Sequence, residues 1–396
     1  MSANWRAVGF AAAFYLLLGA NLPYLPVWLE RARGLSGTEI SLIFAAGTLL
    51  RIFLGPLVGA QSEQKGLKRT LFQLSVILVL AHGLVVPEGP TILLAMVIGA
   101  AAVFGGVIIP LSETLLLAGT KRGWPDYGLA RAIGSMAFIA TNLVLGFLIA
   151  RYGAEIVIWW LLFASILLAG MSLIQPAELG ASRQAQAAGA NLQTSLNEGF
   201  GLYASNPRIL MAGLASSFIQ AAHAYYYNLG SNVWLGQGIA EAHLGSLWSI
   251  GVALEVLLLI VSGWLFRSWS AGAIMLLGGL GAMLRWTIIG FAPSIGVLYL
   301  AQAMHALSFA ATHIGYMQFL RSEVAPEKVG VVISISSAVG YGPMLAILGI
   351  IAGYWYDTFP SAQAQGFWIM AASAFAGCLC ILPILRSQPQ SAAVGG

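Results

Sequence analysis

The chain has 396 residues, of which 59% are hydrophobic and only 8% are charged, and its formal net charge is +4. Soluble domains carry about 25% charged residues, so this composition excludes a soluble globular fold. A helix needs roughly 20 mostly apolar residues to cross the hydrocarbon core, and such stretches recur along the chain with short polar breaks between them. The sequence therefore predicts an all-α membrane protein.

Twelve apolar stretches are predicted to be transmembrane helices, at 5–29, 38–60, 70–87, 91–119, 129–150, 155–175, 207–235, 243–266, 272–291, 294–321, 329–356 and 365–386. The first is too long for a signal-peptide core and contains Pro23 and Pro26 in place of a small-residue cleavage site, so we expect it to be retained. Cys378 and Cys380, two residues apart on one helix, point to different faces. We expect no disulfide, metal site or cofactor.

The basic residues are distributed unevenly between the two sides of these spans. With both termini on the same side, that side carries thirteen Lys and Arg residues, whereas only Arg31, Arg33 and Arg151 lie on the other side. Cytoplasmic loops carry such an excess of positive charge, so we predict a multi-pass protein of the bacterial inner membrane with both termini in the cytoplasm. The positive net charge thus reflects topology and not nucleic-acid binding, and we expect a monomer in the lipid bilayer.

A long break from about residue 176 to 206, rich in Ala, Gln, Gly, Ser and Asn, divides the spans into two groups of six. We predict two half-domains, 1–175 and 207–396, joined by a cytoplasmic linker at 176–206. The halves also align with each other, because Gly47, Arg51 and Gly59 match Gly251, Glu255 and Gly263 at one offset. Six-span repeats resemble the major facilitator fold, in which substrate binds near the midplane between the halves.

Several ionisable residues lie in the middle of predicted spans, where a charge costs about 2.5 to 3.5 kcal/mol on insertion scales. They suggest a substrate cavity with a titratable carboxylate, for which Glu255 is the first candidate, aided by Arg285 and His305. The alternative is that these charges form static ion pairs that hold helices together. In either case we expect Arg51 to lie beside Glu113, and Glu255 beside Arg285. The set comprises Arg51, Glu113, Glu255, Arg285, His223, His305 and His313.

Further candidates for the cavity wall come from helical spacing. In the seventh span, Gln220, His223, Tyr226 and Tyr227 share one face of a regular helix and form a polar and aromatic wall, unless they belong to an interfacial aromatic belt. Trp248 shares the face of Glu255, and Tyr24 lies between the two prolines that we expect to bend or break the first span. Asp126 and Arg131, at the start of the fifth span, are predicted to form an ion pair or a gate, or else to be solvated loop charges.

Nearly the whole chain resembles the phenylpropionate permease branch of the major facilitator superfamily. The resemblance lies in Leu49-Leu50-Arg51, Pro110-Leu111-Ser112-Glu113, Asp126-Tyr127-Gly128-Leu129-Ala130-Arg131, Gln220 to Tyr226, Leu247 to Gly251 before Glu255, and Leu284-Arg285-Trp286. It implies proton-coupled import of a small organic solute, with aromatic carboxylates such as 3-phenylpropionate as the leading class. More distantly, the chain is similar to nucleoside and oligosaccharide proton symporters. The loop Gly59 to Gly66 keeps the superfamily's glycines but lacks its usual Asp.

Other functions remain open at this stage. A proton-coupled nucleoside or sugar symporter would use the Trp and Tyr rings for stacking, and an exporter of small organic compounds would use the same alternating access. An enzyme is disfavoured because the chain contains no His-Glu-x-x-His motif, phosphate-binding glycine loop or intramembrane aspartate pair. A sensor is disfavoured because the linker is too short for a signalling domain.

Overall fold

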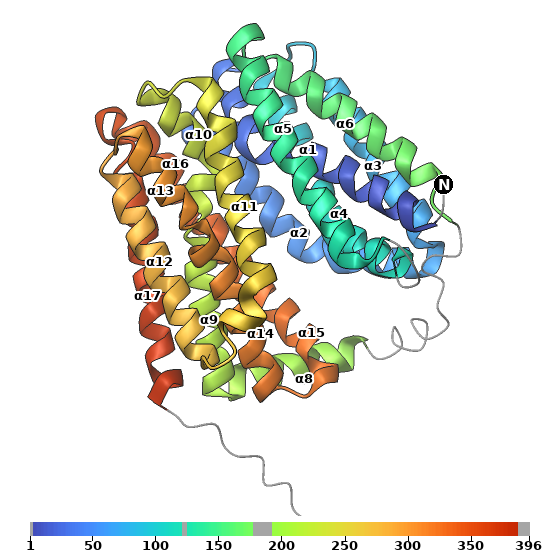
Figure 1. Cartoon of the computed structure of the whole chain (residues 1–396). Coiled ribbons are helices and arrows are strands. Elements are labelled where there is room, and N and C mark those ends of the chain that lie inside the picture. Colours follow the sequence, from blue (N-terminus) through green and yellow to red (C-terminus); the bar gives the residue numbers. More distant parts are fainter. Residues whose placement is uncertain (1–2, 121–124, 177–191, 387–396) are drawn as a thin grey trace, which may run out of the picture.

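The computed structural model describes residues 3–120, 125–176 and 192–386, and this part of the chain is helical without strands. The first six helices pack together, at the right of Figure 1. They are α1 (Ala3–Arg31), α2 (Gly37–Lys65), α3 (Leu67–Leu84), α4 (Thr91–Gly119), α5 (Tyr127–Tyr152) and α6 (Ile156–Leu173). Ser36 begins α2 with a capping box. The Ser36 hydroxyl accepts a hydrogen bond from the Glu39 backbone N–H, and the Glu39 carboxylate accepts one from the Ser36 backbone N–H.

The remaining helices form a second group, and three of its spans are irregular. The elements are α9 (Pro207–Ala221) with α10 (Ala224–Gly236), α11 (Glu241–Leu265), α12 (Ala271–Gly290), α13 (Ile295–Ala303) with the π-helix η1 (Ala306–Ala311) and α14 (Thr312–Glu323), α15 (Pro326–Ser336) with the π-helix η2 (Ser337–Tyr341) and α16 (Gly342–Thr358), the short 3₁₀ turn η3 (Pro360–Ala362), and α17 (Gly366–Arg386).

These helices confirm an all-α membrane architecture. Within the described residues, eleven helical segments are long and apolar enough to cross a membrane. The predicted span 207–235 is the exception, because it is divided into α9 and α10, each too short to cross alone. Pro23 and Pro26 do not break the first span, since α1 is one helix through both.

The predicted linker is partly helical. Residues 177–191 lie outside the described residues, and residues 192–205 form α8 (Leu192–Ser205). Lys328 at the start of α15 forms an ion pair of 3.1 Å with Glu198 of α8, and a side chain at Gly199 would clash with Val331. The second half of the linker is therefore packed on the C-terminal helices, while the domain boundaries at 175 and 207 stay a prediction.

The two groups of helices meet along α2 with α16, α5 with α11 and α1 with α10. Figure 1 shows that they converge at the upper end of the molecule and splay apart from there. At this closed end the carboxylate of Asp357, in the last turn of α16, accepts hydrogen bonds from the Gly37 N–H (2.8 Å), the Thr38 N–H (2.8 Å) and the Thr38 hydroxyl (2.6 Å). An anion is stabilised at a helix N-terminus, so Asp357 joins the two groups through the start of α2.

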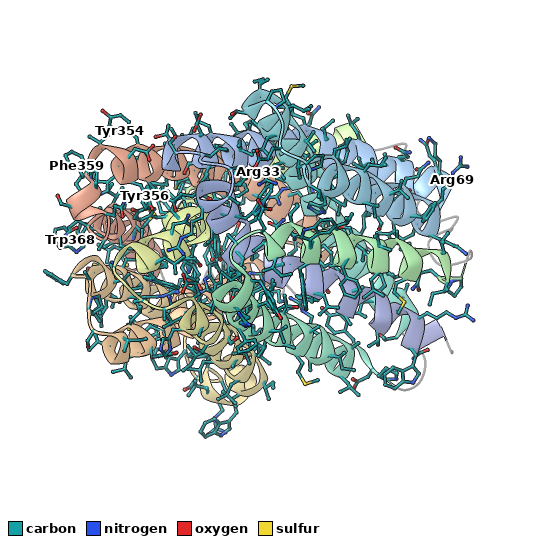
Figure 2. All side chains as sticks on the ribbon, turned by 90° about the horizontal axis from the view of Figure 1, so that it is seen from above. Arg33, Arg69, Tyr354, Tyr356, Phe359 and Trp368 are labelled. Carbon is teal, nitrogen blue, oxygen red and sulfur yellow. The ribbon has the colours of Figure 1, made fainter. Side chains whose placement is uncertain are left out.

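Further contacts reinforce the same end. Arg31 forms an ion pair of 2.8 Å with Glu241, and Tyr356 donates to Glu30 over 2.6 Å. In Figure 2, which views the molecule from above, Tyr356 lies inward of Tyr354, Phe359 and Trp368. A side chain at Gly245 of α11 would clash with the Asn142 carbonyl of α5, so glycine permits the closest approach of these helices.

Candidate functional site

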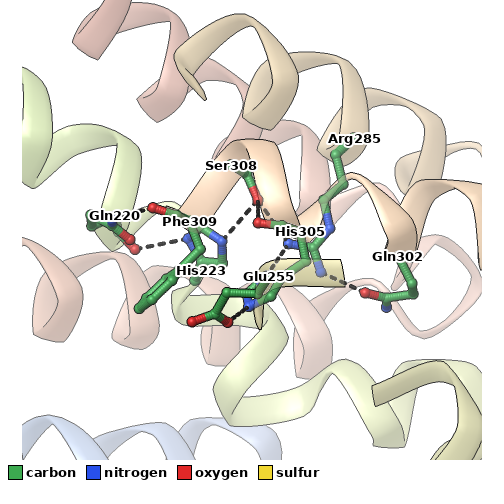
Figure 3. Close-up of polar contacts among 8 residues, drawn as sticks. All are labelled: Gln220, His223, Glu255, Arg285, Gln302, His305, Ser308 and Phe309. Atoms are coloured by element: carbon green, nitrogen blue, oxygen red, sulfur yellow. Dashed lines mark hydrogen bonds and ion pairs between the residues drawn. The ribbon is translucent and has the colours of Figure 1, made fainter. Parts of the chain in front are cut away.

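Arg285 of α12 is fully buried and is the centre of a hydrogen-bond network (Figure 3). Its Nη1 donates to His305 Nδ1 over 2.9 Å and to Ser308 Oγ over 3.1 Å, and its Nη2 donates to Gln302 Oε1 over 2.5 Å. All three acceptors are uncharged in their ordinary forms, and they belong to the irregular span α13–η1–α14. The guanidinium is therefore held by neutral groups and not by a carboxylate.

The partners fix where the ring protons of both histidines lie. A guanidinium only donates, so His305 Nδ1 accepts from Arg285, and the neutral ring carries its proton on Nε2. His305 Nε2 faces Glu255 Oε2 at 3.4 Å. In His223, Nδ1 donates to the Gln220 carbonyl over 3.0 Å, so Nε2 accepts from the Ser308 hydroxyl over 3.2 Å. Hydrogen bonds thus connect His305 with His223 through Arg285 and Ser308, and Glu255 lies beside the His305 end of this chain.

Both histidines lie where the helix is irregular. His223 occupies the break between α9 and α10, and His305 directly precedes the π-helix η1. Irregular backbone at membrane depth is tolerated where it is buried in protein or lines a cavity, and π-turns often mark functional positions. The two irregular sites are tied together by Gln220, whose Nε2 donates to the Phe309 carbonyl over 3.1 Å.

Aromatic rings surround this network. Tyr226 stacks on Trp248 with centroids 4.0 Å apart and planes at 19°. The Arg285 guanidinium lies 4.9 Å from the Tyr226 ring and 4.2 Å from the Trp286 ring, distances at which cation–π attraction stabilises a desolvated cation. Tyr227 stacks on His223 with centroids 5.6 Å apart.

Glu255 is the member of the network that meets the N-terminal helices. Its side chain is 19% exposed, and its charge interacts across the two groups of helices with Arg131 of α5 and within its own group with His313 of α14. Arg131 Nη1 also lies 3.1 Å from Glu113 Oε1, in an ion pair without hydrogen-bond geometry. Tyr127 donates to the second oxygen of Glu113 over 2.9 Å.

The structure changes three of the predicted pairings. Glu113 pairs with Arg131 and not with Arg51, whose side chain packs against Gly106 and interacts electrostatically with Tyr341 of η2. Asp126 does not pair with Arg131. Its carboxylate instead caps α5 by accepting from the Leu129 N–H over 2.9 Å.

His305 lies between Glu255 and Arg285, so the predicted direct pair of these two residues was also wrong. Tyr24, expected at a broken helix beside the cavity, is fully buried, and its hydroxyl donates to the Asn142 carbonyl over 2.6 Å. The face expected for Gln220, His223, Tyr226 and Tyr227 presupposed a regular helix, but the break at His223 divides it.

The residues predicted on α9 to α14 lie close together, and two further members of their network, Gln302 and Ser308, were not predicted. Both lie three residues from His305, which is the spacing of neighbours on one helical face. A search for polar residues at three- and four-residue intervals from His305 would have found them. Trp286, adjacent to Arg285, was missed as a candidate because aromatic residues are common throughout membrane spans.

Comparison with known proteins supports a transporter. The model of the MFS_1 like family matches residues 5–367. The chain is 29% identical to a probable 3-phenylpropionic acid transporter of Escherichia coli (strain K12), over 98% of both chains. It is 24% identical to a maltose permease of Geobacillus stearothermophilus, over 95% of this chain and 94% of that one. A crystal structure of the nucleoside transporter NupG shares the fold, with a TM-score of 0.80, 17% identity and coverage of 98% and 100%.

Proposed function

The chain belongs to the MFS_1 like family and is a multi-pass membrane transporter, and from this premise we propose that it is a proton-coupled symporter of a small organic solute. Its relatives and structural neighbours are transporters and not enzymes. Aromatic carboxylates are the proposed substrate class. This proposal rests mainly on one observation, a partly exposed Glu255 that lies 3.4 Å from neutral His305 and interacts electrostatically with Arg131 of the other half.

The position of Glu255 offers a physical basis for coupling. When ionised, Glu255 attracts Arg131 of the opposite half. A proton on Glu255 removes this attraction, and a ligand shifts a conformational equilibrium by the difference in its interaction with the two states. Protonation of Glu255 therefore biases how the two halves approach each other.

The surroundings suit an aromatic acid. Tyr227 is a partly exposed ring backed by the buried Trp248, and stacked or edge-on aromatic pairs contribute about 0.5–1.5 kcal/mol beyond the burial of their area. Arg131, whose side chain is 44% exposed, is a cation accessible to a carboxylate, whereas Arg285 is fully buried. The relative described as a probable 3-phenylpropionic acid transporter points to the same class.

A nucleoside or sugar symporter is the second candidate. The hydrogen bonds of Arg285 all go to neutral groups within the protein, so this site holds its buried cation without an anionic substrate. The fold shared with NupG and the similarity to a maltose permease favour the same alternative.

For the orientation, we propose that the end of the molecule carrying α8 faces the cytoplasm of a bacterium, because the loops at that end hold most of the basic residues. The closed end with Asp357 and Arg31 then faces outward. The conformation described is closed to the outside.

The test uses proteoliposomes with an imposed inward proton gradient and labelled 3-phenylpropionate. We expect accumulation by the wild type that nucleosides and sugars do not inhibit. Glu255→Gln should abolish accumulation while exchange of labelled for unlabelled substrate continues, because exchange requires no net proton movement. Glu63→Gln, which removes an exposed carboxylate at the end of α2, is the matched control and should accumulate normally.

Each result has a distinct meaning. Normal accumulation by Glu255→Gln would show that Glu255 is not the proton site. Gradient-driven transport of a labelled nucleoside or sugar, with no transport of the acid, would replace the substrate class and leave the coupling proposal standing.

A further inference from the structure

A groove on the outer side of the N-terminal half lies apart from the candidate site. It has a volume of about 440 Å³ and lies between α2, α3 and α4. This volume falls within the roughly 300–1,000 Å³ of small-molecule sites. Its lining includes Val58, Gln61, Gln73, Val76, Ile77 and Phe104.

Helix geometry shows that the groove faces the membrane. On α2, Ile52 contacts Gly342 of the other half, and Gln61 lies nine residues later, half a turn round the helix at about 100° per residue. On α3, Ser75 contacts Ser172 of α6, and Gln73 lies about 200° away from Ser75. Gln61 therefore points away from the C-terminal half, and Gln73 points away from α6.

The groove changes from polar to apolar with depth. Gln61 lies four residues, about 6 Å, before the end of α2, and Gln73 lies six residues, about 9 Å, after the start of α3. Gln61 Nε2 donates to Gln73 Oε1 over 3.4 Å, which leaves further amide donors and acceptors unused by this bond. Unsatisfied amides are costly in hydrocarbon, so these two require polar groups at their depth. Deeper along the helices the lining is apolar, with Val76 and Phe104.

Beyond the amides, toward the α8 end of the molecule, the junction between α2 and α3 is basic. It carries Lys65, Lys68 and Arg69, against the single carboxylate of Glu63, and none of the three cations forms an ion pair with another described residue. Figure 2 shows Arg69 at the outer edge of the N-terminal half. Clusters of Lys and Arg at the end of membrane helices attract anionic headgroups.

We propose that this groove binds one anionic glycerophospholipid from the leaflet at the α8 end. The phosphate lies on Lys65, Lys68 and Arg69, the ester groups lie beside Gln61 and Gln73, and an acyl chain occupies the apolar part. A phospholipid has the same order of charged, polar and apolar groups, at matching depths. A free phosphate would satisfy only the basic turn, and a neutral or zwitterionic lipid would leave the excess of positive charge uncompensated.

The experiment is native mass spectrometry of the full chain in detergent, titrated with phosphatidylglycerol or phosphatidylethanolamine. We expect the wild type to retain one phosphatidylglycerol in preference to phosphatidylethanolamine. The double variant Lys68→Gln, Arg69→Gln should bind phosphatidylglycerol about 30-fold more weakly, since each cation near the surface contributes about a factor of five. The matched control, Arg267→Gln with Arg321→Gln, removes two exposed cations at the same end of the other half and should bind normally.

A third variant distinguishes lipid binding in the groove from attraction to the surface charge alone. Val76→Trp fills the apolar part and leaves every cation in place, so it should also lose the bound lipid. Equal binding by the wild type and Val76→Trp, equal loss in the control, or equal retention of the two lipids would overturn the proposal. Unchanged elution volume and thermal midpoint will show that the variants are folded.

Discussion

Asp357→Asn perturbs the closed end of the molecule, where one carboxylate accepts three hydrogen bonds from the start of α2. Asparagine retains one oxygen for the Gly37 N–H, but its amide cannot accept from the Thr38 N–H and hydroxyl. Hydrogen bonds to a charged group contribute about 1.5–3 kcal/mol each when shielded, and Asp357 is exposed. Discounted for solvent, the loss is about 2 kcal/mol, or about 30-fold in the equilibrium between the closed and open forms of this end.

The assay is a distance measurement between spin labels at Tyr152, the last residue of α5, and Phe359, which follows α16. Cys378 and Cys380 are first replaced by alanine so that only these positions are labelled. We expect Asp357→Asn to increase a population with longer distances. Glu88→Gln, an exposed carboxylate at the same end of the molecule, should leave the distribution unchanged. Identical distributions for wild type and Asp357→Asn would refute the role of Asp357 in closing this end.

Three further predictions concern packing and the site. Gly245→Leu places a side chain against the Asn142 carbonyl, so the same label pair should report a longer distance even with Asp357 intact; an unchanged distance would mean that the helices close without this contact. Ser308→Ala removes an acceptor of Arg285 and the donor to His223, and it should destabilise the protein by about 2 kcal/mol, measured as a lower thermal midpoint in detergent. Ser334→Ala, whose exposed hydroxyl donates only to the Gly330 carbonyl of its own helix, is its control, and equal midpoints would contradict the network. Tyr227→Ala should weaken substrate binding, measured by calorimetry, without unfolding the protein; unchanged affinity would exclude this ring from the site.

The sequence by itself determined the class of the protein and the approximate spans. Helices in a membrane satisfy their backbone hydrogen bonds within each segment, so an apolar run of sufficient length, such as 91–119, is enough to predict α4. The chemistry of the candidate site was also accessible, because a charge such as Glu255 or Arg285 in an apolar span is costly and needs a partner or a role. Glu255 and Arg285 could therefore be identified as candidates without knowing which residues surround them in the fold.

Only the tertiary structure decided which of these residues meet. Arg131 pairs with Glu113 although Asp126 is much closer in sequence, because the side chain of Asp126 is used to cap α5. His305, directly before the π-helix η1, contacts both Glu255 and Arg285, and Ser308 within η1 links His305 with His223 at the break between α9 and α10. Hydrophobic periodicity does not predict such local departures from the regular helix, because they are stabilised by contacts between helices that are far apart in the chain.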